Sequence, residues 1–252
     1  MANKLLTGLN PEQKKAVTYE DGPLLVLAGA GSGKTRVLTY RVAYFISEKK
    51  VKPENVLLLT FTNKAAGEMK QKVVSLIGVS PTFAGTFHSF CARVLRIDGE
   101  KLGVPKGFII YDEQDQKDAV KQILDTMNLS PDSYNPAAVL SSISDAKNQM
   151  LTPLGYSEFA QGEWQEKVFK IWLEYDKFLK EVGALDFDDL LLKTVELFKK
   201  DEGVLFRWQE RLTHIFVDEW QDTNKIQYTL IKLLVGKHLP AGRQENLTVV
   251  GD

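Results

Sequence analysis

The chain has 252 residues, 44% of them hydrophobic and 26% charged, which is ordinary for a soluble globular protein with room for one large domain or two modest ones. Its formal net charge of −1 means that the protein as a whole does not attract polyanions, so a polyanion would have to be bound by a local group of suitable side chains. The single cysteine, Cys91, excludes an internal disulfide. The sequence shows neither a signal peptide nor an apolar run of the ~20 residues that span a membrane. We therefore expect a cytoplasmic protein without membrane contact.

The first part of the chain alternates helices with apolar strands. "LNPEQKKAV" begins a helix, with Asn10 as its N-cap, Pro11 in the first turn and Gln13 three residues after the cap. Two buried strands are indicated at residues 23–28 and 55–60, and helices follow them at 33–47 and 63–78. The stretch 81–90 indicates a short strand that leads into a further helix at about 90–102. This order predicts a parallel α/β sheet.

A helical block interrupts this pattern. From Asp112 to Lys200 the apolar residues follow helical spacing and no strand is indicated, whereas strand character returns at 214–219 and 246–252. The sequence therefore predicts one α/β domain in two parts, with an all-helical subdomain inserted into it. The predicted ranges are 1–110, 111–185 and 186–252.

The stretch "AGAGSGKT" follows a buried strand and opens a helix, which is the context of a phosphate-binding P-loop. Backbone N–H groups and a helix N-terminus form an anion site there, with Lys34 reaching the β- and γ-phosphates and the Thr35 hydroxyl binding Mg²⁺. The implied cofactors are ATP and Mg²⁺. The remaining loop residues expected around the phosphates are Ala28, Gly29, Ala30, Gly31, Ser32 and Gly33.

A carboxylate pair follows a later apolar strand, in "IFVDE". Acidic pairs usually lie on a solvated surface, but behind a buried strand in a chain with a P-loop this pair is strong evidence of a catalytic site. Asp218 is predicted to hold the Mg²⁺ shell, and Glu219 to polarise the attacking water.

Seven stretches, taken together, resemble in order and spacing the motifs of the UvrD/Rep/PcrA-type superfamily 1 DNA helicases. They are "LNPEQKKAV", "AGAGSGKTRVL", "TFTNKAAGEM", "GTFHSF", "LDFDDLL", "VDEWQDTN" and "VVGD". The resemblance touches nearly the whole chain. It implies a RecA-like P-loop NTPase fold and an ATP-dependent 3′-to-5′ DNA helicase or translocase of repair or replication. Its DNA partner is implied to be a single strand, or a duplex with a 3′ single-stranded tail.

The resemblance assigns further residues to the nucleotide. Gln13 resembles the glutamine that recognises the adenine edge, a role compatible with a place in a capping box. Arg36 resembles the residue that packs its guanidinium on the adenine, the alternative being a solvated helix charge. Gln221 resembles the glutamine that links the nucleotide site to the DNA site.

The resemblance also assigns contacts to single-stranded DNA. Aromatic rings stack on bases, and hydroxyl and amide groups at strand-to-helix junctions meet phosphates. For Phe61 the alternative is a core aromatic, and for His88 a satisfied interior histidine; the carboxylates of "LDFDDLL" are expected to cap a helix. The implied DNA contacts are Thr60, Phe61, Thr62, Asn63, Thr86, His88 and Phe187.

The family places a second RecA-like domain with arginine fingers after the "VVGD" motif, and the 252 residues contain none of it. We therefore expect this chain to be an amino-terminal portion, with that domain as its absent partner and with little activity of its own. An alternative is a non-catalytic nucleotide- and DNA-binding module, or a regulatory domain of a nuclease complex.

Overall fold

The computed structural model of the chain describes residues 5–20, 22–29, 31–236 and 246–252. The chain packs into two compact units. The first comprises Met1–Phe90, Asp201–Thr223 and Ile231–Asp252, and the second Cys91–Lys200 and Asn224–Leu230. The domain ranges that end at residues 110 and 185 stay a prediction from the sequence.

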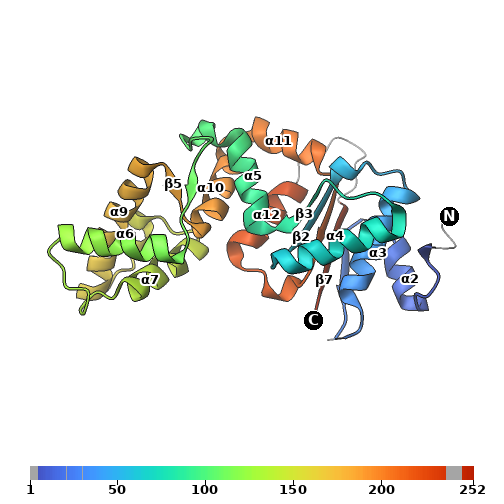
Figure 1. Cartoon of the computed structure of the whole chain (residues 1–252), viewed down its shortest axis with the longest axis horizontal. Coiled ribbons are helices and arrows are strands. Elements are labelled where there is room, and N and C mark those ends of the chain that lie inside the picture. The colour runs from blue at the N-terminus through green and yellow to red at the C-terminus, as the bar shows by residue number, and fades with distance from the viewer. Residues whose placement is uncertain (1–4, 21, 30, 237–245) are drawn as a thin grey trace. The chain divides into compact units, whose positions relative to one another are not determined.

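A parallel sheet forms the centre of the first unit (Figure 1). Its described strands lie in the order β1-β7-β6-β2-β3, and every neighbouring pair is parallel. Because parallel strands point the same way, the loops that follow them meet at one edge, where α/β proteins bind ligands. The strands are β1 (Leu24–Leu27), β2 (Val56–Thr60), β3 (Phe83–Thr86), β6 (His214–Val217) and β7 (Asn246–Gly251).

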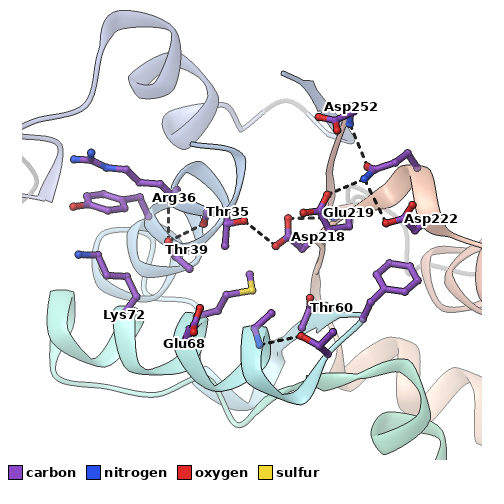
Figure 2. Close-up of a pocket in the computed structure, with 16 residues that line it drawn as sticks. Thr35, Arg36, Thr39, Thr60, Glu68, Lys72, Asp218, Glu219, Asp222 and Asp252 are labelled. Carbon is purple, nitrogen blue, oxygen red and sulfur yellow. Dashed lines mark hydrogen bonds between the residues drawn. The ribbon is translucent and has the colours of Figure 1, made fainter. Parts of the chain in front are cut away.

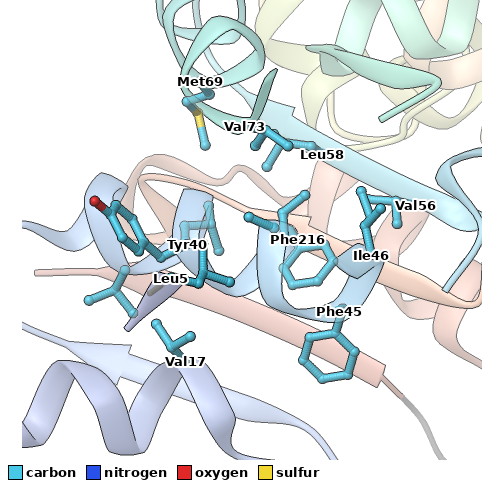
Figure 3. Packing of buried hydrophobic residues seen from close by; sticks show 14 of the residues in the cluster. Leu5, Val17, Tyr40, Phe45, Ile46, Val56, Leu58, Met69, Val73 and Phe216 are labelled. Carbon is cyan, nitrogen blue, oxygen red and sulfur yellow. The ribbon is translucent and has the colours of Figure 1, made fainter. Parts of the chain in front are cut away.

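Helices α2 (Pro11–Thr18), α3 (Lys34–Ser47) and α4 (Asn63–Ile77) share one apolar core with the sheet (Figure 3). Val17 of α2, Leu38 of α3 and Val73 of α4 are fully buried in it, together with Leu58 of β2 and Val250 of β7. Burying each such side chain stabilises the folded state by roughly 1.5–3 kcal/mol relative to leaving it exposed to water. This core therefore holds the P-loop helix α3 firmly against the strands whose ends form the site.

The first unit also contains the helical segments η1 (Pro53–Asn55), α11 (Glu202–Arg211) and η3 (Trp220–Asp222). Helix α5 (Phe87–Asp98) begins in the first unit and continues in the second, whereas α12 (Lys225–Val235) begins in the second and ends in the first; η2 (Gly99–Leu102) belongs to the second unit. The helix after β3 begins at Phe87, three residues before the predicted start, because Thr86 accepts a hydrogen bond from the Ser89 backbone and so caps the helix at its first turn. The predicted capping box of α2 is confirmed, with Asn10 and Gln13 in reciprocal hydrogen bonds.

The second unit is helical, with a core of its own that includes Trp172 and Tyr175. Its helices are α6 (Glu113–Thr126), α7 (Pro136–Asn148), α8 (Pro153–Ser157), α9 (Glu163–Val182) and α10 (Phe187–Lys200). The prediction of no strand between 112 and 200 is wrong at one place, since β5 (Ala184–Leu185) pairs in parallel with β4 (Ile109–Ile110). A two-residue strand is too short to show an alternating pattern.

The predicted fold class, a RecA-like α/β sheet interrupted by a helical insertion, is confirmed. Among the described residues, no helix combines the length and the apolar character that crossing a bilayer requires.

Candidate functional site

A pocket of about 970 Å³ lies at the carboxyl edge of the sheet in the first unit (Figure 2). The P-loop helix α3, helix α4 and the segments that follow β2, β6 and β7 all contribute to it. Its lining consists of Thr35, Arg36, Thr39, Tyr40, Thr60, Phe61, Thr62, Ala65, Glu68, Met69, Lys72, Asp218, Glu219, Gln221, Asp222 and Asp252. The predicted metal residues Thr35 and Asp218 thus face the same space as the predicted DNA residues Thr60, Phe61 and Thr62.

The glycines of the P-loop adopt backbone conformations that side chains disfavour. Gly31 and Gly33 have φ values of 74° and 91°, in the left-handed region, and helix α3 begins directly afterwards at Lys34. A Cβ atom on Gly33 would lie 3.1 Å from Nε2 of Gln13, so that position is also closely packed. Of the predicted phosphate-binding residues, Ala30 lies outside the described residues.

Lys34 is buried, with 9% of its surface exposed, and its ammonium group contacts the carboxylate of Asp252. Strand β7 lies next to β1, with Leu27 opposite Gly251, so the residue after β7 arrives beside the loop after β1. An ammonium group that is paired with a carboxylate can leave it and pair with another anion instead. Lys34 is thereby placed at the P-loop with its charge already compensated.

Thr35 and Asp218, the predicted metal ligands, lie together in the pocket. The Thr35 hydroxyl donates a hydrogen bond of 3.0 Å to Oδ2 of Asp218. Asp218 is only 2% exposed, and this burial raises the pKa of its carboxyl, an effect partly offset by the Thr35 hydrogen bond. A hydroxyl and a carboxylate are the oxygen ligands that suit Mg²⁺, which is commonly held by one or two carboxylates together with phosphates. These residues therefore fit the ion that the sequence predicted.

Glu219 has a left-handed backbone, with φ 51° and ψ 50°. That conformation costs a residue with a side chain about 1–3 kcal/mol and is concentrated at functional sites. Here it turns the chain sharply after β6, so that Asp218 and Glu219 both line the pocket (Figure 2). The strain is offset in part by the hydrogen bond of 3.2 Å that the Glu219 N–H donates to Oδ1 of Asp218.

Gln221 joins the carboxylate of Glu219, the predicted general base, to the end of β7. Its Nε2 donates a hydrogen bond of 2.8 Å to Glu219, and its Oε1 accepts one of 3.2 Å from the backbone N–H of Asp252. Gly251 makes this approach possible, because a Cβ atom there would lie 2.7 Å from Oε1 of Gln221. A side chain at this position would displace the Gln221 amide from the Asp252 N–H.

Gln13 and Arg36 tie the amino-terminal segment to the P-loop. Nε2 of Gln13 donates to the carbonyl of Ser32 at 3.3 Å, while its Oε1 accepts from the backbone N–H of Asn10 at 3.2 Å. The Arg36 guanidinium donates to the carbonyl of Gly8 at 3.0 Å and lies 5.3 Å from the centre of the Tyr40 ring. Arg36 is therefore not a merely solvated charge. Its contact with adenine stays a prediction.

The predicted DNA residues of the first unit gather at the ends of β2 and β3. The Phe61 ring is half-buried and lies 5.7 Å from the fully buried ring of Phe87, so part of it faces the pocket. Thr62 caps α4 by accepting from the N–H of Ala65, and Asn63 follows as the first residue of that helix. These local roles are compatible with DNA contact and leave it a prediction.

Thr60 and Thr86 end strands β2 and β3 in direct register with each other, and both are buried. His88 follows in the first turn of α5 and is half-buried. Phe187 belongs to the second unit, where it is the first residue of α10 and is 46% exposed. Asp186 caps this helix by accepting from the Asp189 N–H at 2.7 Å, as expected for a carboxylate of "LDFDDLL".

The sequence interpretation missed several residues of the pocket. Asp252 was recognised only as part of a motif, because the pairing of β7 with β1 that brings it to the P-loop is visible only in the structure. Tyr40 and Lys72 line the pocket from α3 and α4, with the Lys72 ammonium 5.8 Å from the centre of the Tyr40 ring. Only the packing of the two helices brings this pair together.

Comparison with known proteins identifies the family. Residues 9–252 match the family model described as the UvrD/REP helicase N-terminal domain. The chain belongs to this family. It is 46% identical over 254 aligned residues to the ATP-dependent DNA helicase PcrA of Bacillus subtilis, 45% identical to PcrA of Staphylococcus aureus and 42% identical to PcrA of Leuconostoc citreum. The alignments cover 98–100% of this chain but only 33–34% of the relatives. The chain therefore spans about a third of the length of these UvrD/REP relatives.

Proposed function

We propose that this chain supplies the ATP-binding and single-stranded-DNA-binding portion of an ATP-dependent 3′-to-5′ DNA helicase or translocase that acts in DNA repair or replication. The observation that carries the proposal is the pocket in which Thr35, Asp218, Glu219 and Gln221 meet beside the P-loop. The names of the relatives, all ATP-dependent DNA helicases, support the same conclusion. The cytoplasmic location expected from the sequence belongs to this proposal.

The nucleotide is held in this proposal by residues from two segments, helix α2 and the P-loop with helix α3. Lys34 exchanges the Asp252 carboxylate for the β- and γ-phosphates, whose negative charge the N-terminus of α3 also favours. Gln13 has one N–H and one lone pair left after its contacts with Ser32 and Asn10, enough to recognise an adenine edge. Arg36 presents its guanidinium plane to the base.

The hydrolytic step rests on Asp218 and Glu219. Mg²⁺, held by Thr35 and Asp218, would neutralise phosphate charge. Glu219 accepts the proton of the attacking water, and the hydrogen bond from Gln221 orients its carboxylate. Because Gln221 also contacts the backbone of Asp252, a change at the end of β7 reaches the general base directly.

Phosphoryl transfer also needs positive charge beside the γ-phosphate to stabilise the transition state. Arginine fingers provide this charge and raise the rate by a factor of about 10³–10⁵. The proposal assigns these to a second RecA-like domain as the partner of this chain. The described arginine nearest the P-loop in sequence, Arg36, is engaged with Gly8 and Tyr40. Residues 1–252 alone are therefore expected to bind nucleotide weakly and to hydrolyse it hardly above background.

The test uses the full-length protein that contains these residues. ATP hydrolysis is measured with and without single-stranded DNA, and strand displacement is measured on duplexes with a 3′ or a 5′ tail. We expect DNA-stimulated hydrolysis and displacement from the 3′ tail only, both abolished by Lys34→Ala. DNA binding without hydrolysis would instead favour a non-catalytic nucleotide- and DNA-binding module.

A further inference from the structure

Asn148, the last residue of α7, uses both ends of its side-chain amide within the second unit. Its Oδ1 accepts a hydrogen bond of 2.8 Å from Nδ2 of Asn224, and its Nδ2 donates one of 3.3 Å to Oδ1 of Asp188. The same Nδ2 donates to the carbonyl of Ser144 at 2.9 Å, one turn earlier in α7. An amide can make these bonds together because it carries two N–H groups and a carbonyl oxygen.

The two partners of Asn148 belong to the first turns of two helices. Asn224 caps α12, since its Oδ1 accepts from the N–H of Gln227 at 3.0 Å and its own N–H donates to Oε1 of Gln227 at 3.2 Å. Asp188 is the second residue of α10, directly after Phe187. One side chain therefore connects the start of α10 with the start of α12.

Lys147, beside Asn148, fixes the same end of α10 by charge. Its ammonium lies 2.7 Å from Asp186 and 2.9 Å from Asp189, and only 1% of the Lys147 side chain is exposed. Breaking a buried ion pair leaves an uncompensated charge, so this cluster resists rearrangement. The first turn of α10 and the end of α7 are therefore held together as one body, and Asn148 extends that body to Asn224.

The two connected turns carry residues of two different predicted functions. Phe187, a predicted DNA contact, lies between Asp186 and Asp188. Asn224 follows Gln221 by three residues in "DEWQDTN", the segment whose glutamine contacts the predicted general base. We propose that Asn148 is a positioning residue that couples DNA binding at the first turn of α10 to ATP hydrolysis through Asn224. This inference rests on the proposed function.

The bond between Asn148 and Asp188 suggests a discriminating substitution. Asn148→Asp keeps the size of the side chain and the acceptor for Asn224. It removes the N–H that donates to Asp188 and places a second carboxylate beside the Asp188 carboxylate. In the double variant that combines Asn148→Asp with Asp188→Asn, a single amide again donates to a single carboxylate, with the direction reversed. Ser144→Ala is the matched control, because it removes the contact of 3.3 Å between its hydroxyl and Asn148 and leaves Asp188 and Asn224 untouched.

The experiment measures steady-state ATP hydrolysis of the full-length protein with and without saturating oligodeoxythymidylate, alongside the affinity for that oligonucleotide and the melting temperature. For Asn148→Asp we expect basal hydrolysis within about twofold of the parent and DNA stimulation reduced by about tenfold, which lies within the usual range of coupling between sites. Ser144→Ala should behave as the parent. The double variant should recover most of the stimulation.

Equal stimulation of the parent and Asn148→Asp would overturn the inference while leaving the proposed function intact. A parallel loss of basal and stimulated hydrolysis with a lower melting temperature, unrelieved in the double variant, would also overturn it, because the role would then be structural. If Asn148→Asp does not fold, it is replaced by Asn148→Ser, which shortens the side chain without adding charge. The ratio of ATP hydrolysis with DNA to hydrolysis without DNA then decides in the same way. A parent protein that DNA does not stimulate would remove the proposed function itself.

Discussion

Thr35 and Asp218 are joined by a hydrogen bond of 3.0 Å although 183 positions separate them in the chain. The bond exists because β1 and β6 both end at the same edge of the parallel sheet, with β7 between them. A hydroxyl and a buried carboxylate are thereby brought to hydrogen-bonding distance before any ligand arrives. Such preorganisation lowers the cost of assembling a metal site.

Thr35→Val should weaken magnesium-dependent nucleotide binding. The substitution keeps the shape but removes one oxygen ligand and leaves Asp218 without its hydroxyl donor. We expect a loss of about tenfold in affinity for MgADP by titration calorimetry, which is about 1.4 kcal/mol. Thr35→Ser should bind as the parent does. An equal loss with ADP in the presence of EDTA would show that the hydroxyl does not act through the metal.

Glu219→Gln in the full-length protein should separate binding from turnover. The amide keeps the size of the side chain but cannot accept a proton, so hydrolysis should fall by ~10² or more while the affinity for MgATP stays nearly unchanged. Asp222→Asn is the control, because Asp222 also lines the pocket and lies 3.5 Å from Nε2 of Gln221. Undiminished hydrolysis in Glu219→Gln would assign the base to another residue.

Phe61→Ala should weaken binding to single-stranded DNA by about 1–3 kcal/mol if a base stacks on the ring. Phe61→Leu tests the ring itself, since leucine retains apolar contact with Phe87 but offers no aromatic face. Fluorescence anisotropy with a labelled oligonucleotide gives the affinity, and circular dichroism gives the stability. Full binding by Phe61→Leu would leave the residue a packing partner of Phe87 only.

Arg41→Met should destabilise the chain. The guanidinium is 2% exposed and donates to the carbonyls of Ala16, Val17 and Tyr19 at 2.8, 3.2 and 2.6 Å, and burial lowers its pKa to about 10. Without it these acceptors at the end of α2 lose their donor, so the free energy of unfolding in urea should fall by roughly 2–3 kcal/mol. Arg36→Met, the same substitution on the exposed side of α3, should cost less than about 1 kcal/mol.

Cys91 should be unreactive in the folded protein. Its side chain is fully buried, which raises the pKa of the thiol to about 12, so almost no thiolate exists at pH 8. Labelling with a disulfide reagent should therefore require unfolding, and its rate should rise with urea. Rapid labelling of the native protein at pH 8 would contradict the burial of this residue.

The local features of the candidate nucleotide site could be predicted from the sequence. The conformation of the P-loop follows from its glycines, because Gly31 and Gly33 adopt left-handed φ values at the start of a helix. The strands before the P-loop and before Asp218 were visible as apolar runs. The prediction that the first of them is buried on both faces is wrong, because β1 lies at the edge of the described sheet and its Leu25 and Leu27 are 53% and 67% exposed. The capping box of Asn10 and Gln13 is likewise a matter of three-residue spacing. Each of these signals lies within one segment of chain.

Contacts between distant segments depended on the tertiary structure. No local pattern says that β7 lies between β1 and β6, yet this order brings Asp252 to Lys34 and the backbone of Asp252 to Gln221. Asn148 meets Asp188 and Asn224 only because the ends of three helices converge. Periodicity and spacing in the sequence indicate which face of a helix or strand is buried. Which elements become neighbours depends on the free energy of packing all the buried faces together, which no single segment determines.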